Sequence, residues 1–153
     1  MMLPESKWKQ FGLPDAEIKG IVIHNTNSNK SAEELEMWLK TAKTSQSAHF
    51  IVDHKEVRQL LPLNWSSFNT GMGMDFGNTS CISIEICSNP NTEKYLQGQN
   101  RAIKLIKELM EEFHLTLEDI YFHRDFQPNV NCPAQILHLY GTKQNFLQLL
   151  KGE

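Results

Sequence analysis

The apolar residues of this chain fall into short runs and stripes that predict strands separated by helices. Residues 18–23, IKGIVI, form a compact apolar run typical of a buried strand, and His24 ends it. A polar loop then leads into SAEELEMWLK, where Ser31 and Glu34 have the spacing of a capping box and predict the start of a helix. On that helix we expect three side chains to be buried: Leu35, Trp38 and Leu39.

The middle of the chain predicts a hairpin, a long loop and an alternating strand. AHFIVD and EVRQLL flank a short HK turn and predict the hairpin. Residues 64–79 show little periodicity and hold three of the eight glycines, which indicates a long loop suited to binding residues. SCISIEIC alternates strictly, so its isoleucines face one way and four residues face the other: Cys81, Ser83, Glu85 and Cys87.

The last third predicts a long helix, a short strand and two further helices. Residues 93–114 carry one apolar stripe, formed by Ala102, Ile106, Leu109 and Phe113. IYF, residues 120–122, predicts a strand that ends at His123, Pro133 suits the first turn of a helix, and Gly141 stops that helix. NFLQLL predicts a short closing helix. Together these elements predict an α/β fold with a central mixed sheet flanked by helices, in a single domain over residues 1–153.

Bulk composition excludes several classes of function. The net charge is −3, which gives no reason to expect a nucleic-acid partner. No apolar run approaches the roughly 20 residues needed to span a bilayer, so membrane insertion is not expected. The first residues, MMLPESKWKQFG, contain no apolar signal segment, so we expect synthesis in the cytoplasm without a signal peptide.

Two expected strands end in histidine, and a cysteine follows the second of them. His24, His123 and Cys132 are N and S donors, and three such ligands with one open position are typical of a catalytic zinc site. No C-x2-C or H-x3-H pair occurs, which argues against a closed structural site. The alternatives are a histidine that caps the sheet and an inert buried thiol.

Glu85 is the candidate base for such a site. It is the only acid in SCISIEIC, and a lone carboxylate in an apolar strand is costly unless it is paired or used in chemistry. A zinc-bound water needs a group that takes its proton and passes it to the leaving group. The alternative is a structural acid held by backbone donors or by a buried cation.

Four segments together resemble the zinc-dependent N-acetylmuramoyl-L-alanine amidases of type 2. They are IVIHNT, SAHFIVD, the tract from WSSFNTG to SIEICSN, and HRDFQPNVNCP, and they cover about residues 18–140. The likeness is greatest to the catalytic domains of endolysins from phages of Gram-positive bacteria. It implies a zinc cleft at one edge of the sheet and cleavage of the amide between N-acetylmuramic acid and L-alanine in peptidoglycan.

The resemblance also implies roles for individual residues. His24, His123 and Cys132 match the ligands of one Zn²⁺ ion, and Glu85 matches the glutamate that activates water in the subgroup with SIEIC. Other members use a tyrosine where this chain has Ala48, which favours the glutamate.

The chain departs from the family pattern at two places. Many relatives have a lysine two residues before the ligand cysteine, where this chain has Val130. Either Asn129 or Asn131 replaces it as a neutral donor, or the role is vacant. A W-H-A-G-like segment is common in the long loop, where this chain has SFNTG, residues 67–71.

Four further candidates for substrate binding are His49, Trp65, Phe68 and Asn69. His49 either lines the cleft or supports the hairpin, and Trp65 and Phe68 could stack on a sugar or on the stem peptide.

Two other functions fit the same residues. A non-catalytic wall-binding module typically lacks the ligand cysteine, whereas Cys132 is present here. A zinc amidase that recycles soluble muropeptides would suit cytoplasmic synthesis as well as an endolysin released to the wall, possibly through a holin. We expect a monomer with no separate wall-binding domain within these 153 residues.

Overall fold

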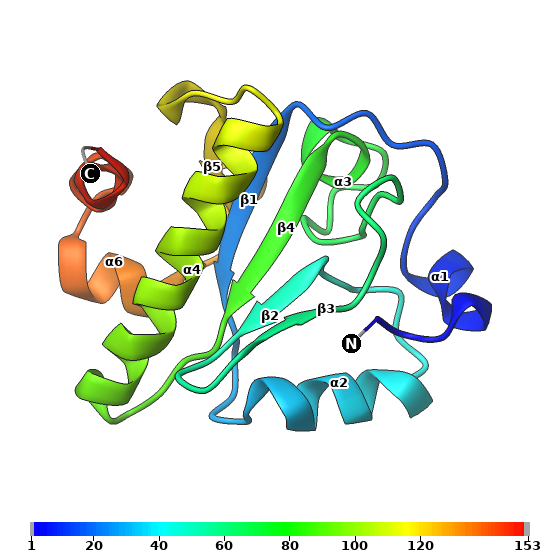
Figure 1. The fold of residues 1–153 in the computed structure, drawn as a ribbon, viewed down its shortest axis with the longest axis horizontal. Coiled ribbons are helices and arrows are strands. Elements are labelled where there is room, and N and C mark those ends of the chain that lie inside the picture. Colours follow the sequence, from blue (N-terminus) through cyan, green and yellow to red (C-terminus); the bar gives the residue numbers. More distant parts are fainter. Residues whose placement is uncertain (1, 152–153) are drawn as a thin grey trace.

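Five strands form one sheet in the computed structural model, which describes residues 2–151 (Figure 1). The strands are β1 (Gly20–Asn25), β2 (Phe50–Val52), β3 (Val57–Gln59), β4 (Cys81–Ile86) and β5 (Ile120–Phe122). Their order in the sheet is β3-β2-β4-β1-β5. All neighbours are parallel except β2 and β3, which form the expected hairpin, so the mixed sheet is confirmed.

Seven α-helices and two 3₁₀ turns connect and cover the strands within the described residues. The α-helices are α1 (Glu5–Phe11), α2 (Ala32–Thr41), α3 (Phe76–Thr79), α4 (Thr92–Glu112), α5 (His123–Phe126), α6 (Ala134–Tyr140) and α7 (Lys143–Leu147). The 3₁₀ turns span Leu117–Asp119 and Gln148–Leu150. The sequence patterns missed α1, α3 and α5, because these short helices have too few turns to show periodicity.

The principal core lies between one face of the sheet and α4. Ile82, Ile84 and Ile86 of β4 are fully buried there with Ala102 and Ile106 of α4, as the alternation predicted. Figure 1 shows α4 crossing the front of the sheet. Burying side chains of this size from both elements is the main source of stability for the layer.

A second core covers the other face, under α1 and α2. Ile51 of β2 and Cys87, which follows β4, pack there with Phe11 of α1 and Leu39 of α2. The expected burial of Trp38 is wrong, because its side chain is 49% exposed.

The ion pair between α2 and β3 explains the exposure of Trp38. Glu36 occupies the inward position of α2, where its Oε2 accepts from Nη1 of Arg58 at 2.8 Å. The capping box at Ser31 is present as expected, and Asp53 also accepts from the N–H of Ala32 at 2.9 Å. These contacts fix the rotation of α2 and leave Trp38 at the surface rather than in the core.

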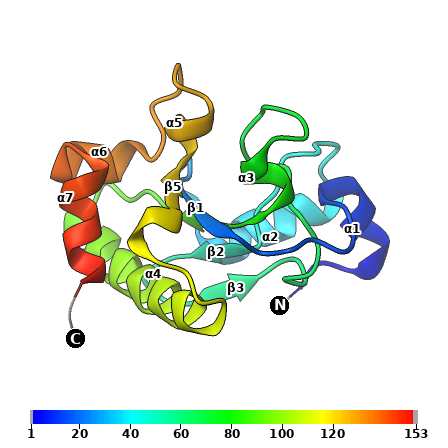
Figure 2. The ribbon, with the colours of Figure 1, turned by 90° about the horizontal axis from the view of Figure 1, so that it is seen from above.

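The carboxyl ends of β1, β4 and β5 lie together at one end of the sheet, where the site is built. Figure 2 shows α4 on one side of the sheet, while α3 and α5 with their loops project from the other side. Within residues 2–151, no helix combines the length and apolar character needed to cross a bilayer.

Candidate metal centre and active site

Three neighbouring strands place side chains in one row on the face opposite α4. His24 of β1 and Glu85 of β4 are register partners, and Ile51 of β2 is the partner of Glu85 on its other side. Because alternate residues of a strand share a face, this row lies away from the isoleucines that contact α4. Oε1 of Glu85 consequently lies 3.6 Å from Nδ1 of His24.

His24 is held in one orientation by the long loop. Its Nε2 lies 3.0 Å from Oδ1 of Asn69, whose Nδ2 donates to the backbone oxygen of Gly77 at 2.9 Å. Because Oδ1 of an amide only accepts, Nε2 of His24 carries the proton and Nδ1 keeps a free lone pair. Burial, and then the nearby His123, lower the pKa of His24 to about 3. The ring is therefore neutral, which is the form that binds a metal.

His123 opens α5 directly after β5 and is oriented in a similar way. Its Nε2 lies 3.0 Å from the backbone oxygen of Thr70 and 2.9 Å from Oε1 of Gln127. A carbonyl oxygen only accepts, so Nε2 donates and Nδ1 is free for a ligand. The ring centroids of His123 and His24 are 4.8 Å apart.

Cys132 completes a set of three ligand atoms. Its Sγ lies 3.6 Å from Nδ1 of His24, and the ligand atoms of His24, His123 and Cys132 all lie within 4.8 Å of one another. In a tetrahedral zinc site, bonds of about 2.0–2.3 Å hold such atoms about 3.5 Å apart. The nitrogen and sulfur donors of this set suit zinc. The distance between Sγ of Cys132 and Nδ1 of His24 matches the spacing of ligand atoms in such a site.

Asn25 joins the strand of His24 to the segment that carries Cys132. Its Oδ1 accepts from the backbone N–H of Gln135 in the first turn of α6 at 2.9 Å, and its Nδ2 donates to the hydroxyl of Tyr95 on α4 at 3.0 Å. Two ligands are thereby held together by protein contacts alone. Sequence reasoning missed Asn25, because no local pattern reveals a bond to a helix 110 positions away.

Glu85 occupies a partly enclosed position beside the ligands. Its side chain is 26% exposed, and burial raises the pKa of its carboxyl to about 7. Near neutral pH this carboxyl can therefore both accept and release a proton. The imidazole of His24 lies next to this carboxyl, with 3.6 Å between Nδ1 and Oε1.

A cleft of about 740 Å³ opens over this row. Three of the expected substrate-binding residues line it, Phe68, Asn69 and Asn131. Val130 and Ala48, which stand where relatives have other residues, also line it. The apolar part of its lining comes largely from α2 and the sheet, through Leu35, Trp38, Leu39 and Ile51. Trp38 is therefore a lining residue that the sequence pattern assigned to the core.

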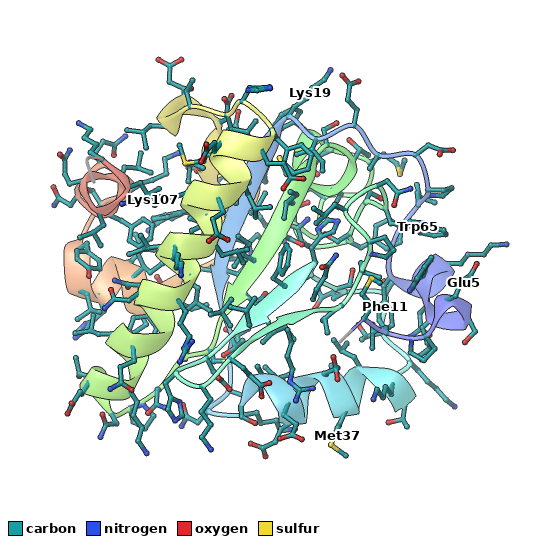
Figure 3. The ribbon with its side chains drawn as sticks, in the orientation of Figure 1. Glu5, Phe11, Lys19, Met37, Trp65 and Lys107 are labelled. Atoms are coloured by element: carbon teal, nitrogen blue, oxygen red, sulfur yellow. The ribbon has the colours of Figure 1, made fainter. Side chains whose placement is uncertain are left out.

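The other three expected substrate-binding residues do not line the cleft. Asn129 is exposed to solvent and is not among the residues that line the cleft. Trp65 is half-buried against Trp8 of α1, with ring centroids 5.6 Å apart, and Figure 3 shows it on the α1 side of the molecule. His49 is 1% exposed and sits beneath the cleft. His49 is therefore placed to support the hairpin and does not line the cleft.

His49 belongs to a buried hydrogen-bond network that ends at His24, a candidate metal ligand. Its Nδ1 accepts from the backbone N–H of Ser83 at 3.0 Å, and its Nε2 donates to the backbone oxygen of Trp65. Oγ of Ser83 contacts Oγ of Ser67, to which Nδ2 of Asn69 donates at 3.2 Å. Asn69 then accepts from His24, so the orientation of this ligand depends on several buried polar groups.

Comparison with known proteins agrees with this fold and arrangement of residues. The family model described as N-acetylmuramoyl-L-alanine amidase matches residues 14–135, most of the chain. The chain belongs to this family, and the resemblance identified from its motifs is confirmed.

Individual relatives give the same assignment. The amidase CwlA of Bacillus subtilis is 34% identical over 119 residues, which cover 76% of this chain and 43% of that protein. The structure of PlyL superposes with a TM-score of 0.91 at 27% identity, covering 99% of this chain and 95% of the other. The catalytic domain of XlyA superposes with a TM-score of 0.86 at 28% identity, covering 99% of both chains. The chain spans between 37% and 55% of the length of the curated relatives it matches.

Proposed function

We propose that this protein hydrolyses the amide bond between the lactyl group of N-acetylmuramic acid and L-alanine in bacterial peptidoglycan. The observation that carries the proposal is the convergence of His24, His123, Cys132 and Glu85 on one cleft. Family membership supports it, and so do the names of the relatives, which are N-acetylmuramoyl-L-alanine amidases.

His24, His123 and Cys132 would hold one Zn²⁺ ion through Nδ1, Nδ1 and Sγ. When bound, this ion would polarise the scissile carbonyl and lower the pKa of a water molecule in the cleft. Asn69 keeps His24 in the tautomer that binds metal, and Gln127 and the backbone of Thr70 do the same for His123.

Glu85 takes a proton from the attacking water and returns it to the nitrogen of the departing alanine. Its side chain faces the cleft next to His24, so one carboxylate reaches both positions in turn. Asn131 stands next to Cys132 on the cleft wall and is our candidate for the neutral donor that replaces the lysine of many relatives. In this role its side-chain amide stabilises the negative charge that develops on the carbonyl oxygen.

The substrate in this proposal is intact cell wall. The test is mass spectrometry of purified Gram-positive peptidoglycan after digestion, with and without a zinc chelator. Peptides released with a free L-alanine amino terminus, only in the absence of chelator, are the expected result. Cleavage of soluble muropeptides with no release from the wall would favour a recycling enzyme instead, and no cleavage of either would contradict the proposal.

A further inference from the structure

The cleft carries almost no formal charge. Among the described residues that line it, none is a lysine or an arginine, and Glu85 is the only acid. With zinc bound, the two positive charges of the ion would be balanced by the Cys132 thiolate and the Glu85 carboxylate. The cleft would then offer no net attraction to a negatively charged group.

Three basic residues lie within two positions of a lining residue, and none of them lines the cleft. Lys40 follows Leu39, and its Nζ lies 3.9 Å from Oε2 of Glu36. Lys30, just beyond the lining residue Ser28, is exposed and acts electrostatically on Glu34 at the start of α2. Arg124 follows His123 but lines a separate pocket. None of these charges is a lining group of the cleft itself.

Neutral polar groups take the place that cations would otherwise occupy. Amide and hydroxyl side chains line the cleft along with its apolar residues, and Asn27, Ser28, Gln46 and Asn131 are among them. Such groups can donate to and accept from a carboxamide. A carboxylate entering the same space would lose hydration without meeting a cation, and it would be repelled by Glu85.

We propose that this cleft selects stem peptides whose second residue carries a carboxamide, D-isoglutamine, over those that carry a free carboxylate, D-glutamate. The inference rests on the proposed function, because it requires the stem peptide to extend from the metal centre along the cleft. The sugar and its amidated lactyl group are uncharged, so the stem is the part of the substrate in which this difference arises. Val130 is the residue whose neutral side chain keeps the cleft wall near Cys132 free of charge.

The test compares two soluble substrates that differ only at that group, MurNAc-L-Ala-D-isoGln-L-Lys and MurNAc-L-Ala-D-Glu-L-Lys. The kcat/KM of each is measured on the zinc-loaded protein from the appearance of the free alanine amino terminus. We expect the amidated substrate to be cleaved about tenfold or more efficiently, since a site without a partner for a charge discriminates strongly against it. Equal efficiency, or a preference for the free acid, would overturn the inference.

Two variants test the electrostatic cause. Val130→Lys adds a cation to the cleft wall and is expected to reduce the preference at least threefold, whereas Val130→Met adds similar length without charge and should preserve it. A preference that is the same in Val130→Lys and Val130→Met would overturn the assignment to charge. If wild-type protein cleaves neither substrate nor intact wall, the proposed function itself fails, which is distinct from cleavage of both at equal rates.

Discussion

Nδ1 of His24 and Oε1 of Glu85 lie 3.6 Å apart because their residues are register partners on two parallel strands. The candidate metal ligand and the candidate base are thus spaced by the hydrogen-bond ladder between β1 and β4 in the interior of the sheet. The other two ligands come from the segment after β5, and Asn25 ties this segment back to β1. The sheet fixes the reaction centre, and the loops supply the groups around it.

Replacing Asn69 with alanine is expected to weaken zinc binding about 10- to 100-fold, because His24 loses the acceptor that fixes its tautomer. A competition titration with a chromophoric chelator measures the affinity. Asn64→Ala, an exposed position in the same loop, is the control and should bind zinc like the wild type. Equal affinities in Asn69→Ala and Asn64→Ala would contradict the role of Asn69.

Asn131 and Asn129 form a matched pair on either side of Val130. Asn131 lines the cleft and Asn129 does not, so Asn131→Ala should lower kcat by about tenfold or more while Asn129→Ala leaves it unchanged. The comparison uses a soluble muropeptide at saturating concentration. A larger loss in Asn129→Ala would show that the other asparagine is the donor.

The stability of the protein should depend on the protonation of His49. Burial lowers the pKa of His49 to about 4, whereas its ordinary value is 6.5. Between these values the unfolded chain binds a proton that the folded protein does not, so stability is complete above pH 6.5 and is lost as the pH falls towards 4. The full contribution is on the order of 3 kcal/mol.

His49→Gln removes this titration while keeping one acceptor and one donor in the side chain. Urea unfolding of zinc-loaded wild type and variant at pH 7.5 and pH 5 measures the difference, and other titrating groups are common to both proteins. We expect the variant to lose less stability than the wild type over this interval. Identical losses would show that His49 is not held neutral in the fold.

Trp38→Ala should raise KM for a soluble muropeptide about 2- to 10-fold, since an aromatic side chain is removed from the lining of the cleft. Unfolding free energy should change by less than about 1 kcal/mol, because the side chain is 49% exposed. Met37→Ala is the control, since Met37 is 61% exposed and points outward from α2 in Figure 3. A KM effect of equal size in Met37→Ala would exclude a specific contact with Trp38.

Much of this architecture follows from local patterns in the sequence. Strict alternation in SCISIEIC assigned Ile84 to the core and Glu85 to the opposite face, because a strand has only two faces. His24 and His123 could be placed together because the carboxyl ends of neighbouring parallel strands meet at one end of a sheet.

Residues whose position depends on distant contacts could not be predicted in this way. Trp38 faces the cleft because the ion pair between Glu36 and Arg58 fixes the rotation of α2. The two residues of this pair are 22 positions apart in the sequence. The partners of His49 and Asn25 likewise come from separate elements. Periodicity carries no information about such pairings.

The most direct test of the central claim measures zinc content and amidase rate together in wild type, Glu85→Gln and Cys132→Ala. We expect one zinc ion per chain in the wild type and in Glu85→Gln, with at least a 100-fold loss of rate in the latter. Cys132→Ala should lose both zinc and activity. Full activity in Glu85→Gln with zinc bound, or tightly bound zinc in Cys132→Ala, would contradict the assignment of base and ligands.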